Sequence, residues 1–113
     1  MIKIAPSMLS CDFSAMANEA HSIENAGADV LHLDVMDGIF VPNISFGIPV
    51  IASLRPHSAL PFDVHLMATE HDFFVTELIG MGVEQIVFQV ETERHLDYRL
   101  NQIHEAGIRA GVA

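Results

Sequence analysis

Residues 31–38 read Leu31-His32-Leu33-Asp34-Val35-Met36-Asp37-Gly38, and this stretch decides how the chain is expected to fold. Apolar and polar side chains alternate along it, which predicts a β-strand with two unlike faces. His32 and Asp34 share one face, whereas a parallel sheet covered by helices normally carries apolar side chains on both. A histidine and an aspartate there need a compensating partner. Metal ligation is one such compensation, and a hydrogen-bonded His-Asp pair at a strand end is the other.

The stretch Phe62–Met67 repeats this pattern one predicted strand later. Phe62, Val64 and Leu66 form its apolar face, and Asp63, His65 and Met67 form the other. Two imidazoles and a carboxylate at the C-terminal ends of neighbouring parallel strands suit a divalent transition metal such as zinc, iron(II) or manganese. The repeat therefore favours a metal or acid-base site over a purely structural network.

The rest of the chain alternates between strand and helix patterns. Strands are expected at residues 2–6, 29–36, 62–67, 85–90 and 109–113. Helices are expected from Phe13 to a stop at Gly27, at 49–54, after a capping box formed by Thr69 and Asp72, and from near Thr92 to a stop at Gly107. Such alternation implies parallel strands with right-handed crossovers, hence a doubly wound sheet or a (β/α)₈ barrel. The pattern alone does not choose between them.

Composition narrows the class of protein. The chain has 113 residues, enough for one domain, and a formal net charge of -10, which disfavours binding to nucleic acid or to anionic membranes. It has one cysteine, no signal-peptide pattern and no apolar run of membrane-spanning length, so a cytoplasmic location is expected. Five histidines lie on predicted helices or loops, where exposure to solvent is expected: His21, His57, His71, His95 and His104.

Three segments together resemble the ribulose-phosphate 3-epimerase family: Ile4–Ser10, Leu31–Ser45 and Asp63–Met67. The resemblance implies the first half of a (β/α)₈ TIM barrel, running roughly to its fifth strand. It also implies metal-dependent inversion at C3, which interconverts ribulose 5-phosphate and xylulose 5-phosphate. By position, His32, Asp34 and His65 match ligands of a divalent ion (zinc, iron(II), manganese or cobalt). Asp34 also matches a catalytic aspartate, and Ser7 and His65 match residues that contact the sugar phosphate.

The chain also departs from what the family implies. A (β/α)₈ barrel takes about 250 residues, so the second catalytic aspartate, which is also the fourth metal ligand, and the phosphate-binding loops have no counterpart here. Gln89 stands where family members commonly have a histidine. Two alternatives therefore stay open: an inactive epimerase fragment with residual metal binding, and a 3-epimerase of a six-carbon ketose phosphate. An open half-barrel should expose two strand edges and an apolar inner face, which predicts self-association.

Overall fold

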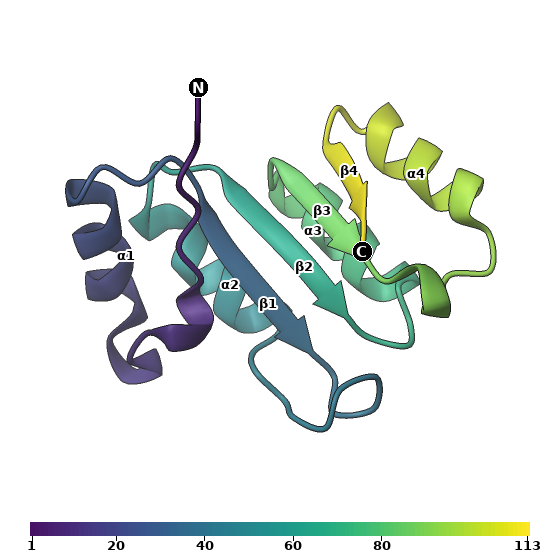
Figure 1. Cartoon of the computed structure of the whole chain (residues 1–113), viewed down its shortest axis with the longest axis horizontal. Helices are drawn as coiled ribbons and strands as arrows, with labels where there is room; N and C mark the ends of the chain where they lie inside the picture. The colour runs from purple at the N-terminus through teal and green to yellow at the C-terminus, as the bar shows by residue number, and fades with distance from the viewer.

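The computed structural model describes residues 1–113 and contains one parallel sheet whose strands follow the order β1-β2-β3-β4 (Figure 1). The strands are β1 (Leu31–Met36), β2 (Phe62–Met67), β3 (Gln85–Phe88) and β4 (Arg109–Val112). The helices are α1 (Met16–Asn25), α2 (Ile48–Leu54), α3 (Asp72–Met81) and α4 (Leu96–Glu105). Four short 3₁₀ turns complete the elements: Met8–Ser10, Phe13–Ala15, Arg55–His57 and Val90–Thr92. None of the helices combines the length and the apolar character that a membrane span needs.

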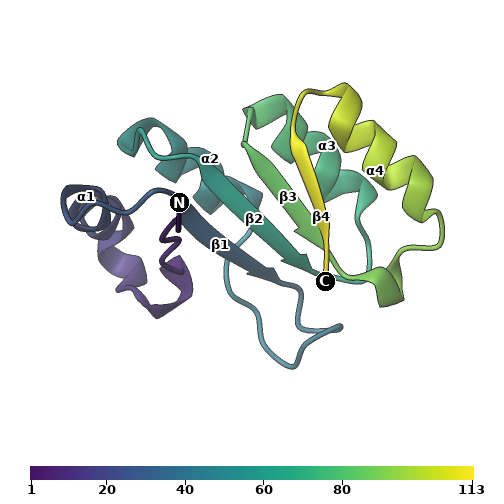
Figure 2. The same ribbon diagram turned by 45° about the horizontal axis from the view of Figure 1, so that its top comes forward.

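The sheet has one covered face and one open face. Helices α2 and α3 lie behind it, while α1 and α4 flank it, and no helix lies on the face toward the viewer (Figure 1). The turned view keeps the four strands side by side, with α2 and α3 behind them, α1 on the left and α4 on the right (Figure 2). We call the open face the inner face, because it would line the interior if the sheet curled into a barrel.

The covered face holds the hydrophobic core that the alternation in residues 31–36 and 62–67 predicts. Its strand residues are almost completely buried: Leu31, Leu33, Val35, Phe62, Val64, Leu66, Ile86 and Phe88. Helix residues such as Ile51, Leu78 and Ile103 belong to the same cluster. Burial of each such side chain contributes about 1.5–3 kcal/mol, so this face fixes which side chains point to the other one.

The strand expected at residues 2–6 does not form, and the sheet has four strands instead of five. The segment still runs beside β1, since the carbonyl of Ile4 accepts from the N–H of Asp29 at 2.9 Å and that of Pro6 accepts from His32 at 3.0 Å. The N–H of Ile4 is occupied by the side chain of Asp29, and Pro6 has no N–H to donate. A regular ladder is therefore replaced by one parallel bridge between Ser7 and His32.

Three helix boundaries also differ from the expectation. Residues 13–15 form a 3₁₀ turn, with Phe13 45% exposed, so α1 begins only at Met16. The strand expected to reach Val90 ends at Phe88, and a 3₁₀ turn over Val90–Thr92 delays α4 to Leu96. The predicted capping box is wrong, because the backbone N–H and the hydroxyl of Thr69 both donate to Oδ2 of Asp37 instead of capping α3.

Exposure was expected for five histidines, and it holds for four of them but not for His71, which is only 3% exposed. Nδ1 of His71 lies 3.2 Å from Glu93 Oε2, and Arg99 Nε donates to the same oxygen at 2.7 Å. Arg99 also pairs with Asp72. Burial opposes ionisation of Glu93, but the hydrogen bond from Arg99 and further donors lower the pKa of Glu93 to about 2. This network ties the loops after β2 and β3 to α4.

Candidate metal centre

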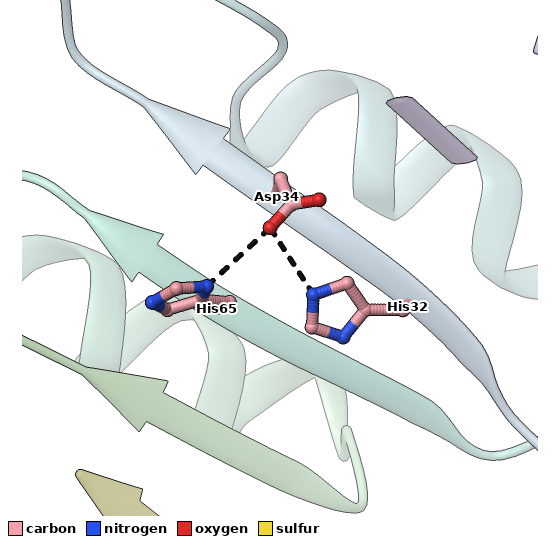
Figure 3. Close-up of side chains that lie close together, drawn as sticks. All are labelled: His32, Asp34 and His65. Carbon is pink, nitrogen blue, oxygen red and sulfur yellow. Dashed lines mark hydrogen bonds and ion pairs between the residues drawn. The ribbon is translucent and has the colours of Figure 1, made fainter. Parts of the chain in front are cut away.

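Three side chains converge on the inner face, two from β1 and one from β2 (Figure 3). Oδ1 of Asp34 lies 3.1 Å from Nε2 of His32 and 3.4 Å from Nδ1 of His65. One ligand atom from each residue lies within 4.8 Å of the other two. The parallel register sets Asp34 directly beside His65, which explains how residues 31 positions apart in the sequence meet.

The cluster lies along the strands, not at their C-terminal ends as expected. Asp34 and His65 each occupy the fourth position of a six-residue strand, and His32 occupies the second position of β1. Because side chains alternate between faces, two residues of one strand can share a face only at a spacing of two. His32 and Asp34 therefore lie on the same face of β1, on either side of Leu33.

Ser7 joins the same cluster from the N-terminal segment. Its hydroxyl donates to Oδ2 of Asp34 at 2.9 Å, and the parallel bridge to His32 holds its backbone in place. The other oxygen of Asp34 is thus left to the two imidazoles. The Asp34 side chain is only 13% exposed, so its charge is screened little by water. All four residues that the sequence singled out are brought together.

Polar side chains from the next strand along the sheet contact the two imidazoles through the ring nitrogens that do not face Asp34. Nδ1 of His32 lies 2.9 Å from Asp63 Oδ2, and the Gln85 amide donates to the other oxygen of Asp63 at 2.9 Å. Nε2 of His65 lies 2.6 Å from Gln89 Oε1. The hydrogen bond to Asp63 raises the pKa of His32, burial opposes the rise, and the charge of Asp34 adds to it. These orienting contacts are typical of ligand histidines.

Sequence reasoning missed the roles of Asp63 and Gln85. The alternation does place Asp63 on the face of His65, but it does not give the register between strands. Only the pairing of His32 with Asp63 across β1 and β2 makes Asp63 a partner of His32. Because both oxygens of Asp63 are engaged by His32 and Gln85, Asp63 is an orienting group and not a further ligand of the cluster.

The donor set fits a divalent cation. Two imidazole nitrogens and one carboxylate oxygen are ligands that zinc, iron(II), manganese and cobalt accept, and three protein ligands leave open positions for water or substrate. The largest surface pocket, of about 570 Å³, lies elsewhere, between the loops that follow β2 and β3. It is lined by the His71–Glu93–Arg99 network and does not include the cluster. The candidate centre lies on the open inner face.

A parallel sheet with its helices on one face and a His-Asp-His cluster on the other defines about half of a (β/α) barrel with a candidate metal site. Comparison with known sequences then gives the family. Residues 3–113 match the model of the ribulose-phosphate 3 epimerase family. The chain belongs to this family.

Individual relatives agree with that assignment. The chain is 45% identical over 112 residues to ribulose-phosphate 3-epimerase of Bacillus subtilis, with 99% of this chain and 52% of the relative covered. It is 46% identical over 112 residues to the cytoplasmic isoform from Oryza sativa subsp. japonica, covering 98% of this chain and 49% of that protein. The chain thus spans about half the length of the curated relatives it matches.

Solved structures show the same fold at low sequence identity. A Yersinia pestis DHPS bound to a pterine-sulfa conjugate superposes with a TM-score of 0.67 at 13% identity, covering 97% of this chain and 42% of that one. The N-acetylmannosamine-6-phosphate 2-epimerase from Clostridium perfringens gives 0.66 at 16% identity, covering 96% and 50%. At such identities the likeness concerns the fold alone, and it agrees with the half-barrel expected from the sequence.

Proposed function

We propose that this chain supplies the metal-holding part of a 3-epimerase that interconverts ribulose 5-phosphate and xylulose 5-phosphate. The observation that carries the proposal is the convergence of His32, Asp34 and His65 within 4.8 Å on the inner face. Membership of the epimerase family and the printed names of the relatives support it. The Oryza sativa relative, named as a cytoplasmic isoform, supports a cytoplasmic location.

In this proposal His32, Asp34 and His65 hold one divalent cation. When bound, the cation supplies positive charge that stabilises the enediolate oxygens as negative charge develops on them. Which of zinc, iron(II), manganese or cobalt is used in the cell depends on availability as well as on ligand type, because imidazole and carboxylate donors accept all four.

Asp34 is the proposed proton acceptor. Its carboxylate takes the proton from C3, the electron pair of the broken C–H bond forms the C2–C3 double bond, and the π pair of the C2 carbonyl moves onto its oxygen to give the enediolate. The Ser7 hydroxyl, 2.9 Å from Oδ2, holds the carboxylate in one orientation for this step. Ser7 and His65 flank Asp34 and are proposed to contact the sugar phosphate. Inversion is complete when an acid on the opposite face returns a proton to C3.

A second candidate function is cation binding without turnover. Asp63 is the other carboxylate close to the cluster, and both its oxygens are engaged by His32 and Gln85. It is therefore not free to act as the acid on the opposite face. Epimerisation then requires a carboxylate from outside this cluster, and a chain without one would keep its cation affinity and lose turnover.

An isomerase assay separates these candidates. The chain is incubated with ribulose 5-phosphate, with and without added divalent cation, and xylulose 5-phosphate is measured through a coupled reaction. Cation-dependent product that disappears in the Asp34→Asn variant is the expected result. A folded, cation-loaded chain without turnover would support the second candidate. Faster conversion of a six-carbon ketose phosphate such as fructose 6-phosphate would instead indicate a substrate of that class.

We also propose that the chain associates with itself. Strand β4 is the last strand of the sheet, so the backbone groups on its outer edge have no strand beside them. The inner face was expected to be apolar, but it carries His32, Asp34, Asp63 and His65. The apolar side chains of these strands point to the opposite face, where the helices cover them. The edge, and not an apolar face, is therefore the surface that favours association.

Size-exclusion chromatography with light scattering tests this association. A dimer or larger species that dissociates on dilution is expected, with a smaller associated fraction in Val112→Lys, since a lysine on an edge strand disfavours edge pairing. Val112 is 48% exposed, so the substitution should leave the core intact. A molar mass equal to that of the monomer throughout the dilution series, including the most concentrated sample, would rule the association out.

A further inference from the structure

The two imidazoles of the cluster are held by different kinds of partner. Asp63 holds Nδ1 of His32 through a carboxylate at 2.9 Å, whereas Gln89 holds Nε2 of His65 through an amide oxygen at 2.6 Å. The rings therefore present different nitrogens to Oδ1 of Asp34. His32 presents Nε2 at 3.1 Å, and His65 presents Nδ1 at 3.4 Å.

The strand register explains this difference. His32 lies directly opposite Asp63 on β2, but His65 lies opposite Val87 on β3, whose side chain cannot form a hydrogen bond. Gln89 follows Val87 by two positions, immediately after the end of β3, so the strand periodicity brings it to the same face. Its amide reaches the outer nitrogen of His65 from there.

The position of the His65 ring proton depends on two competing neighbours. An amide oxygen only accepts hydrogen bonds, so its contact with Nε2 requires the proton on that nitrogen. The carboxylate of Asp34 lies beside Nδ1 and favours the proton there instead. In a neutral imidazole one nitrogen carries the proton and the other carries the lone pair. The contact at 2.6 Å against the one at 3.4 Å favours the proton on Nε2.

We propose that Gln89 is a positioning residue that keeps His65 in the Nε2–H tautomer, so that the lone pair of Nδ1 faces the space shared with His32 and Asp34. This role of Gln89 rests on the proposed function in one respect, because it assumes that Nδ1 of His65 is a ligand of the cation. A protonated Nδ1 cannot bind a cation, so loss of the Gln89 amide would leave the residues in place without the necessary lone pair.

Nitrogen-15 NMR of histidine-labelled protein tests the tautomer in the absence of any metal. At about pH 8, where an ordinary imidazole is neutral, His65 of the native chain should show a protonated Nε2 and an unprotonated Nδ1. In Gln89→Leu the proton should move toward Nδ1. In Gln89→Glu, which keeps an acceptor oxygen at the end of a side chain of equal length, the native tautomer should return. His32, held by Asp63, serves as the internal control and should not change.

Titration with cobalt(II), followed by its visible absorption, gives the second readout. Gln89→Leu should bind cobalt(II) about 10- to 100-fold more weakly than the native chain, and Gln89→Glu should recover the affinity. A native His65 with its proton on Nδ1 would overturn the proposal, and so would a Gln89→Leu variant with unchanged tautomer and affinity. A native chain with the expected tautomer but no affinity for cobalt(II) would instead contradict the proposed function and leave the role of Gln89 intact.

Discussion

Replacing Asp34 with asparagine should lower the affinity of the chain for zinc or cobalt(II) by about 100-fold or more. Oδ1 of Asp34 is the atom on which both imidazoles converge, and the carboxylate is the only negative charge among the three proposed ligands. Loss of an outer partner alone typically costs about 10- to 100-fold, and loss of a charged ligand costs at least as much. Competition with a chromophoric chelator measures the change.

The matched control is Asp97→Asn, which removes the same charge from an exposed position in the first turn of α4. Both variants carry one negative charge fewer than the native chain, so a general electrostatic effect would weaken binding equally in both. Equal affinities for the native chain and Asp34→Asn, or equal losses in the two variants, would show that Asp34 is not a ligand.

The stability of the fold should fall steeply in acid because of Glu93. The pKa of Glu93 is about 2 in the folded chain, below the ordinary value of 4.5 expected when unfolded, despite the burial that opposes ionisation. A lowered pKa stabilises the fold above the unfolded value, and this contribution disappears as the pH falls from about 4.5 to 2. The shift corresponds to about 3 kcal/mol at most, and the Glu93 side chain, 8% exposed, is little screened by water. Urea denaturation at several pH values measures the loss.

Two variants isolate this contribution. Glu93→Gln should cost about 2–3 kcal/mol at neutral pH, because Arg99 then loses a charged partner, and its stability should depend less on pH below 4.5. Glu91→Gln, an exposed carboxylate in the same loop, should change neither quantity by more than about 0.5 kcal/mol. Equal stability of Glu93→Gln and the native chain, with the same dependence on acid, would contradict the assigned role of the network.

The sequence predicted which side chains of β1 and β2 form the core, because burial follows the alternation directly, but the expectation of an apolar inner face was wrong. It failed where tertiary contacts replace local rules. Residues 2–6 have a strand-like composition, yet Asp29 occupies the N–H of Ile4 and leaves only a bridge. Thr69 has the spacing of a cap, yet it bonds to Asp37 instead. The burial of His71 accompanies its contact with Glu93, a residue 22 positions later that no local pattern connects to it.

The residues of the candidate metal site could be predicted from the sequence, but the side chains that orient them could not. His32, Asp34 and His65 were expected on one face from periodicity alone, and the structure brings them together. Ser7 came only from the family resemblance, since nothing in its own segment points to Asp34. The pairing of Gln89 with His65 depends on the register between β2 and β3 and on the contact it allows, which a sequence does not contain.

A zinc titration of the native chain, followed by the NMR signals of its seven histidines, tests the proposed metal centre most directly. We expect one zinc ion per chain, with changes in the signals of His32 and His65 and none in those of the five other histidines. Saturation without any change at His32 and His65, or changes centred on His71 or on the exposed histidines, would contradict a metal centre on the inner face.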